Sequence, residues 1–134
     1  MREILFKAKR RDTGEWIEGY YQKRFDCFGF IENLIFRSKS KIEWEYAEID
    51  ENTLCQYTGL TDKNGNKIWE NDICSTDLER PFLIVEFRNG GFMYNCNDGN
   101  KDYYDIMLPT EPLEQKDKYT EVIGNIFDNP ELLQ

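Results

Sequence analysis

The sequence predicts an all-β (mainly β) protein with one or two short helical turns. Short runs of apolar and aromatic residues alternate with polar ones, and Gly, Asn and Asp punctuate them at close intervals. Aromatic residues make up 15% of the 134 residues, which favours half-buried pleated surfaces. Because no long segment has a 3.6-residue period, we expect antiparallel strands throughout, with a small barrel from about residue 51 onward.

The first fifty residues contain strand signals separated by a turn. Residues 3–9 begin apolar and then alternate, residues 12–15 have turn chemistry, and residues 16–21 form the next strand candidate. Residues 25–30 are rich in phenylalanine, and residues 42–49 alternate strictly. This part is predicted to be a β-rich subdomain spanning residues 1–50.

The alternation in residues 42–49 separates two kinds of side chain. Trp44 and Tyr46 fall on one face of the strand, while Glu43 and Glu45 fall on the other. We expect the glutamates to form the solvated face and interpret them as structural, not as a catalytic carboxylate pair.

Residues 51–75 change in character. Residues 51–56 are predicted to be a helical turn or short connection, and Asn64-Gly65 is a strong signal for a type I′ hairpin turn. Residues 68–69 then enter a strand, residues 70–72 turn the chain, and residues 73–75 begin another strand.

The remaining chain is predicted to be a hairpin, loops and a final strand. The hairpin covers residues 82–96 with its turn at residues 89–91. Polar residues 97–102 and 110–118 are expected to be connections. Residues 119–127 form a strand interrupted by Gly124, and residues 128–133 resemble a cap followed by a terminal helical turn.

Composition excludes several classes of site. The chain has no histidine, which removes Ser-His-Asp and Cys-His catalysis and Cys/His zinc sites. It has neither a signal-peptide core nor a run long enough to span a membrane, so we expect a cytoplasmic protein without membrane contact. The four cysteines are widely spaced, which favours reduced and mostly buried thiols over disulfides; they are Cys27, Cys55, Cys74 and Cys96.

Charge is unevenly distributed along the chain. Residues 1–50 hold 10 basic and 10 acidic side chains, whereas residues 51–134 hold 7 basic and 16 acidic ones and so account for the net charge of −9. An acidic surface repels phosphate, which makes nucleic acid an improbable partner of the C-terminal part. The basic residues suggest a weaker alternative, a nucleic-acid contact through Lys7, Lys9, Arg10 and Arg11.

The carboxylates of the central segment invite a metal interpretation. Glu70, Asp72 and Asp77 form a local group, and Asp62 begins a pattern that matches the first ligands of a calcium loop. That pattern lacks the required glycine and the closing glutamate. We therefore interpret Asp72 as a turn residue that accepts backbone hydrogen bonds, and we expect no metal or cofactor.

Two segments resemble the YopX family, small proteins encoded mainly by bacteriophages and prophages. They are residues 58–73 (TGLTDKNGNKIWENDI) and residues 121–133 (EVIGNIFDNPELL). The resemblance implies an SH3-like small barrel over residues 51–134, and it implies no catalytic residues. It also implies a structural turn at residues 70–72, where this chain has Asn71 in place of the usual Gly, and Asn tolerates the positive φ angle expected there. The positions expected to form the family's structural signature are Thr58, Gly59, Leu60, Asp62, Asn64, Gly65, Ile68, Trp69, Glu70, Asp72, Ile73, Gly124 and Asn125.

Three functions remain as hypotheses. The first is a non-enzymatic module that binds an unknown protein partner or assembles into a homo-oligomer. The second is a nucleic-acid-associated phage accessory protein that uses the N-terminal basic clusters. The third and weakest is a metal-assisted hydrolase built on Glu70, Asp72 and Asp77.

Overall fold

The computed structural model describes residues 4–76, 82–97 and 102–133, and strands dominate it. The chain divides into two compact units, residues 1–57 and residues 58–134. The all-β prediction is confirmed. Strand β5 (Cys55–Thr61) begins in the first unit and ends in the second, and the domain boundary expected after Asp50 stays a prediction.

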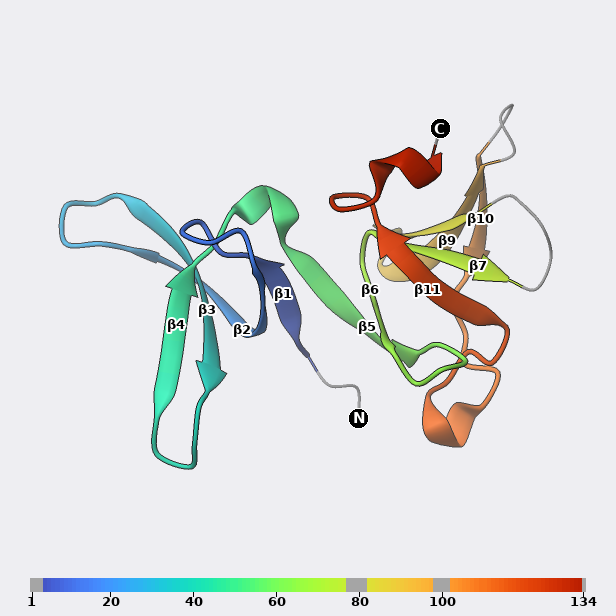
Figure 1. The fold of residues 1–134 in the computed structure, drawn as a ribbon, viewed down its shortest axis with the longest axis horizontal. Coiled ribbons are helices and arrows are strands. Elements are labelled where there is room, and N and C mark those ends of the chain that lie inside the picture. The colour runs from blue at the N-terminus through green and yellow to red at the C-terminus, as the bar shows by residue number, and fades with distance from the viewer. Residues whose placement is uncertain (1–3, 77–81, 98–101, 134) are drawn as a thin grey trace. The chain divides into compact units, whose positions relative to one another are not determined.

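Unit 1 is built on antiparallel neighbours in the order β4-β3-β2-β1, with β5 beside β1 (Figure 1). The strands are β1 (Phe6–Lys9), β2 (Trp16–Phe25), β3 (Ile31–Ser38) and β4 (Trp44–Glu48). Backbone bonds also join the chain after β4 to the chain around β1, since Asp50 N–H donates to Lys9 O at 2.9 Å and Arg11 N–H donates to Glu48 O at 3.0 Å. The sheet therefore curls around one enclosed face.

The enclosed face of unit 1 is aliphatic. Its buried core comprises Ala8, Ile17, Ile35, Ala47 and Ile49. Strand registers align Ala8 with Ile17 and Ile35 with Ala47, so these side chains meet on the same side of the sheet.

The β2–β3 hairpin extends past its neighbours. Among the described strand pairs, β1 reaches β2 only as far as Gly19, and β4 reaches β3 only as far as Leu34. Figure 1 shows the free end of this hairpin beyond β4. The strand expected at residues 25–30 is therefore mainly the turn of the hairpin, and β3, which the sequence analysis did not identify, follows it.

A short 3-10 turn, η1 (Glu51–Thr53), leads from β4 into β5. The Asp50 carboxylate accepts the Asn52 N–H at 3.0 Å and so caps the turn. The helical turn predicted for residues 51–56 is thus confirmed only in its first half, since Cys55 and Gln56 already pair with β1.

Unit 2 contains a five-stranded antiparallel sheet in the order β10-β9-β8-β7-β11. After β5, the elements of unit 2 are β6 (Lys67–Trp69), β7 (Asp72–Thr76), β8 (Leu83–Arg88), β9 (Gly91–Asn97), β10 (Asp102–Ile106), η2 (Pro112–Glu114), β11 (Thr120–Asn125) and η3 (Pro130–Leu133). The terminal helical turn is confirmed as η3, and the expected interruption at Gly124 is a register shift in the pairing of β11 with β7. The SH3-like barrel stays a prediction.

The core of unit 2 mixes aliphatic and aromatic side chains. Its buried members are Leu60, Ile68, Cys74, Val85, Phe92, Tyr94 and Met107. They come from strands β5 to β9 and from the segment after β10, so the signature segment and the β8–β9 hairpin share one core.

The hairpin turns differ from the sequence expectation in one respect. A type I′ turn needs two positive φ angles, and Asn89 (53°) with Gly90 (84°) provides them between β8 and β9. At the predicted site only Gly65 is left-handed, with a φ of 85°, while Asn64 is not. The Asn64-Gly65 turn exists, but the I′ geometry predicted for it is wrong.

Strands β2 and β3 approach each other closely at Gly19. A Cβ added to Gly19 would lie 2.1 Å from the Phe36 carbonyl oxygen. We expect Gly19→Ala to lower the free energy of unfolding by about 2–3 kcal/mol, the range of overpacked cores, as measured by urea unfolding. Gly91→Ala is the control, because nothing lies within 4 Å of its added Cβ; equal losses in both variants would contradict the packing described here.

Candidate functional site

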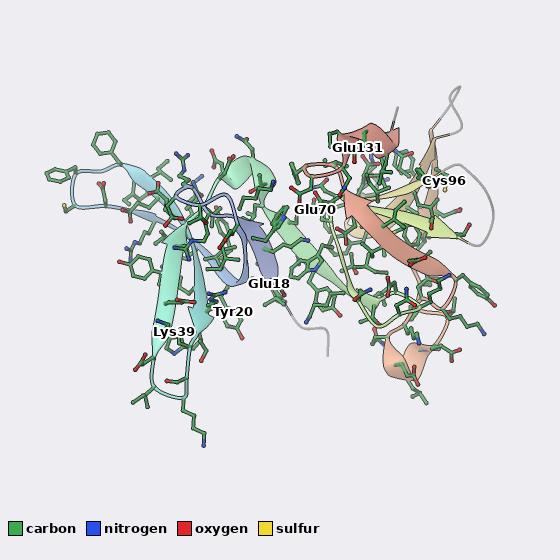
Figure 2. All side chains as sticks on the ribbon, in the orientation of Figure 1. Glu18, Tyr20, Lys39, Glu70, Cys96 and Glu131 are labelled. Atoms are coloured by element: carbon green, nitrogen blue, oxygen red, sulfur yellow. The ribbon has the colours of Figure 1, made fainter. Side chains whose placement is uncertain are left out.

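The outer side of the unit 1 sheet presents a group of aromatic rings. Tyr20, Phe36 and Tyr46 lie side by side across three strands, and Trp44, the first residue of β4, lies beside them. The Tyr20 and Trp44 ring centroids are 6.1 Å apart, and those of Phe36 and Tyr46 are 5.4 Å apart. We call Tyr20, Phe36, Trp44 and Tyr46 the aromatic face; Figure 2 labels Tyr20 among the side chains of unit 1.

Three of these rings are exposed, and Phe36 is half-buried. Tyr20, Trp44 and Tyr46 are 54%, 57% and 59% exposed. The alternation predicted for β4 is present. The prediction that the glutamates form its solvated face is wrong, because Trp44 and Tyr46 occupy that face. Glu45 shares the side of buried Ala47, because Ile35 and Ile17 of the neighbouring strands form the core on that side.

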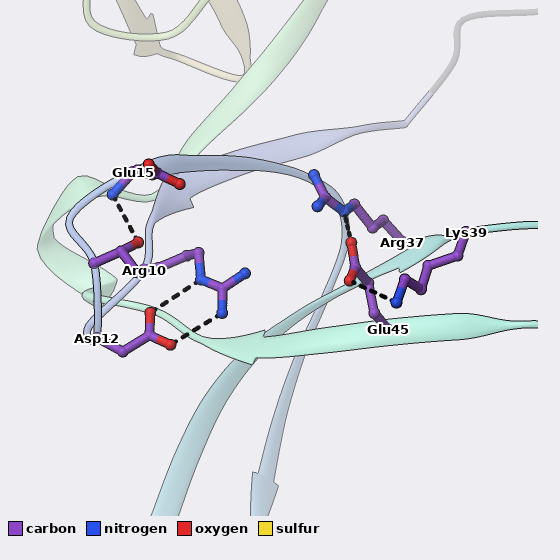
Figure 3. A network of polar contacts seen from close by, with 7 residues as sticks. Arg10, Asp12, Glu15, Arg37, Lys39 and Glu45 are labelled. Atoms are coloured by element: carbon purple, nitrogen blue, oxygen red, sulfur yellow. Dashed lines mark hydrogen bonds and ion pairs between the residues drawn. The ribbon is translucent and has the colours of Figure 1, made fainter.

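Glu45 is held on that side by cations. It forms ion pairs with Arg37 and, at 3.8 Å, with Lys39 (Figure 3). The hydrogen bond from Arg37 lowers the pKa of the Glu45 carboxyl below its ordinary value. The carboxylate is therefore engaged in a surface ion pair.

Cations lie on the same side of the sheet as the aromatic face. The Lys7 and Lys9 ammonium groups lie 4.6 Å and 5.4 Å from the Trp16 ring centroid, and the Arg24 guanidinium lies 5.7 Å from that of Tyr46. Arg24 also pairs with Glu32 at 2.9 Å. Such an arrangement suits recognition by packing and cation–π attraction, and it contains no nucleophile with an adjacent base.

The four basic residues proposed for nucleic acid do not form one patch. Lys7 and Lys9 lie beside Trp16, whereas Arg10 makes two 3.0 Å hydrogen bonds to Asp12 (Figure 3). This hydrogen bonding lowers the pKa of the Asp12 carboxyl. Arg11 donates to the Ile49 carbonyl at 3.3 Å and lies 3.7 Å from Glu48, so carboxylates offset both arginines.

In unit 2, Asp62 joins the two signature segments. One carboxylate oxygen accepts the N–H groups of Asn64 and Asn66, each at 2.9 Å, and the other accepts the Val122 N–H at 2.9 Å. The residue is fully buried. Both oxygens are thus occupied by the backbone.

Asp72 holds the next turn of the signature. It is 2% exposed and accepts the Trp69 N–H at 2.8 Å, while Asn71 between them has a φ of 72°, as predicted. Glu70 lies in the same turn, and Asp77 lies outside the described residues. The structure therefore places Asp72 in the backbone hydrogen bonding of a turn.

The other signature positions occupy backbone or core roles. Thr58 donates its hydroxyl to the Ile68 carbonyl at 2.7 Å, and Gly59 has a φ of 88°. A Cβ on Gly124 would lie 2.5 Å from the Asn129 side chain, which also accepts the Asn125 N–H at 3.2 Å. The buried apolar members are Leu60, Ile68, Trp69 and Ile73, and the turn members are Asn64 and Gly65.

Two buried polar residues of unit 2 were not identified from the sequence. The Tyr94 hydroxyl donates to Asp117 at 2.8 Å and lies 3.3 Å from the Thr120 hydroxyl. Burial raises the pKa of Tyr94. No spacing in the sequence links positions 94 and 117, so only the fold reveals the pair.

The cysteines are free thiols in different environments. Cys55 and Cys74 are buried, Cys96 is half-buried and Cys27 is exposed. Burial, reinforced by the charges of Asp72, Asp62 and Asp117, raises the pKa of Cys74 well above its usual value. The Cys74 thiol is consequently protonated and poorly nucleophilic.

Fold and surface together define an all-β protein of two antiparallel units with an open aromatic sheet face. The family model described as YopX protein matches residues 5–134, so the chain belongs to the YopX family and the resemblance is confirmed. The crystal structure of protein EF1440 from Enterococcus faecalis has a similar fold, with a TM-score of 0.58 and 23% identity over 100% of both chains. No curated protein matches the chain. Within the described residues, no helix is long and apolar enough to cross a membrane.

The Asp62 carboxylate can be tested by an isosteric change. Asp62→Asn replaces one acceptor oxygen with an NH2 group that faces backbone donors, and we expect a loss of about 2–4 kcal/mol in the free energy of unfolding. Chemical denaturation measures it. Asp12→Asn is the matched control, because Asp12 pairs with Arg10 at the surface and its loss should have a much smaller effect. Equal stability of both variants would contradict the structural role of Asp62.

Proposed function

We propose that this YopX-family chain is a non-enzymatic protein-binding or assembly module of phage or prophage origin, acting in the host cytoplasm. The partner is proposed to pack on the aromatic face. The observation that supports this most directly is the exposure of Tyr20, Trp44 and Tyr46 on strands that are otherwise well packed.

The size and composition of the face suit a binding site. Three rings more than half exposed, at about 200 Å² each, offer roughly 340 Å² of largely apolar surface, within the range of patches that are often functional. Tyrosine and tryptophan are also the residues most often responsible for binding energy at interfaces. Because strand pairing fixes their backbones, they lose little conformational entropy on binding.

The state of the signature carboxylates supports a non-enzymatic role. Asp62 uses both oxygens on backbone N–H groups, and Asp72 accepts the Trp69 N–H from a buried position. A general base must be free to reach a substrate proton, and Asp62 is committed elsewhere.

Single-stranded nucleic acid is the second candidate partner. Lys7 and Lys9 beside Trp16, and Arg24 near Tyr46, combine rings and cations on the same side of the sheet, which is how stacking platforms are built. The pairing of Arg10 and Arg11 with carboxylates weakens this alternative.

Partner capture tests the primary proposal. We expect the full chain, immobilised, to retain a protein from a lysate of the bacterium that harbours its gene, and Trp44→Ser with Tyr46→Ser to weaken retention about 100-fold, since two interface anchors are removed. Quantitative mass spectrometry of the retained protein is the measurement. The control changes Ile106 and Leu108 to Ser, two exposed aliphatics of unit 2. Undiminished capture by the Trp44/Tyr46 variant would refute the proposed surface.

Salt-dependent retention tests the nucleic-acid alternative. We expect no retention of single-stranded oligonucleotides at about 0.15 M salt, because the protein's net charge is −9 and its arginines near the face are paired. Fluorescence anisotropy measures binding at two salt concentrations. Tight binding that weakens with salt and with Lys7→Ala and Lys9→Ala would instead favour the alternative.

A further inference from the structure

The end of the β2–β3 hairpin exposes a second aromatic group. Phe25, Phe28 and Phe30 are 71%, 82% and 69% exposed, and Ile31 follows them at 51%. We call these four residues the phenylalanine tip. It belongs to the part of the hairpin that extends past β1 and β4.

The turn that holds the tip is internally hydrogen-bonded. One Asp26 oxygen accepts the N–H groups of Phe28 and Phe30 at 2.8 Å and 2.9 Å, and the Asp26 N–H donates to the Phe30 carbonyl at 2.8 Å. Gly29 adopts a φ of 84° and donates to the Asp26 carbonyl at 3.1 Å. The rings therefore point outward from a preformed turn, which reduces the entropy lost on docking.

Deepening the proposed function, on which this inference rests, we propose that the phenylalanine tip of one copy of the chain docks on the aromatic face of a second copy. Every copy offers one tip and one face, so a two-fold dimer or a closed ring would occupy both on every copy. At about 200 Å² per aromatic side chain, the exposed rings of tip and face offer roughly 800 Å² per copy, which just reaches the ~800 Å² per partner that a stable interface needs.

The charge distribution favours contact between two copies through unit 1. Residues 1–57 hold 10 basic and 11 acidic side chains, a net charge of −1, whereas residues 58–134 hold 7 and 15, a net charge of −8. Two copies would therefore repel each other least where tip and face lie. The acidic Asp26 at the tip is also opposite in sign to Arg24, which lies near Tyr46 of the face, and to Lys7 and Lys9 beside Trp16 on the same side of the sheet.

The same charges disfavour an anionic lipid surface as the occupant. Such membranes attract clusters of basic residues, but this chain is acidic overall and places Asp26 among the phenylalanines. Insertion of the tip would bring that carboxylate toward the acyl chains. Binding to anionic vesicles by the monomer would thus count against the proposal.

Sedimentation of the full chain over a range of concentrations tests the contact. We expect reversible association, and we expect two variants to associate about 100-fold more weakly: a tip variant, Phe28→Ser with Phe30→Ser, and a face variant, Trp44→Ser with Tyr46→Ser. Ile42→Ser is the matched control, because Ile42 is 89% exposed in the adjacent hairpin turn and should leave association unchanged. Thermal unfolding of each variant checks that it is folded.

Mixing the two variants distinguishes this contact from other symmetric ones. The tip variant retains an intact face and the face variant an intact tip, so a one-to-one mixture can form one of the two contacts. We therefore expect the mixture to associate more weakly than the wild-type chain but more strongly than either variant alone. A contact of tip with tip or of face with face would not be restored by mixing. A folded wild-type chain that stays monomeric overturns the inference, and so does a mixture that associates no more strongly than either variant alone at the highest concentration measured.

Failure of the self-contact can be separated from failure of the proposed function. A monomeric chain that still captures a protein through Trp44 and Tyr46 would refute the self-contact and leave the binding module intact. A monomeric chain whose capture is indifferent to these two rings would refute both.

Discussion

A buried carboxylate that bonds only to backbone N–H groups organises unit 2. Asp62 fixes the turn after β5 through Asn64 and Asn66, and it reaches β11 through Val122. Burial of a charge is costly unless it is fully hydrogen-bonded, and three donors from two distant segments meet that condition only in the native arrangement. The carboxylate therefore couples the local turn to the last strand and explains why residues 58–73 and 121–133 occur together.

The same turn appears in unit 1 in a different environment. Asp26 and Asp62 each accept N–H groups two and four residues further on, and each donates its own N–H to the carbonyl four residues further on. Gly29 and Gly65 stand at the same place in the two turns, with φ angles of 84° and 85°. In unit 2 the second oxygen binds β11, whereas in unit 1 the turn stands at the free end of a hairpin and displays phenylalanines. One local structure thus supports a buried connection in one unit and an exposed tip in the other.

The sequence predicted what is local and missed what depends on neighbouring strands. The turn at Asn71, the β8–β9 hairpin and the interruption at Gly124 follow from the conformational preferences of Asn and Gly, and all are present. Strand β3 was missed because Leu34, Ile35 and Phe36 interrupt the alternation that marks a strand. The geometry of the Asn64-Gly65 turn was mistaken because the Asp62 side chain selects a different hydrogen-bonding pattern.

The aromatic face could be anticipated only in part, because its exposure depends on neighbouring strands. Alternation in β4 correctly separated Trp44 and Tyr46 from Glu45, but one strand cannot show which of its faces is covered. Ile17 and Ile35 on β2 and β3 decide that the covered face is the other one, so the rings remain outside. Asp117 and Tyr94 were missed because a tertiary hydrogen bond leaves no spacing in the sequence.

The openness of the aromatic face follows from the number of layers in unit 1. Burial of both faces of a sheet requires a covering layer on each side, and the described part of unit 1 adds to its strands only η1 and short connections. One face is closed by curling around Ile17, Ile35 and Ile49, and the other faces solvent. Threonine or charged residues would satisfy a solvated strand face equally well, so folding alone does not account for tyrosine and tryptophan there. A docking partner would supply the missing layer over this ordered surface of rings, and the proposed partner is a second copy of the chain.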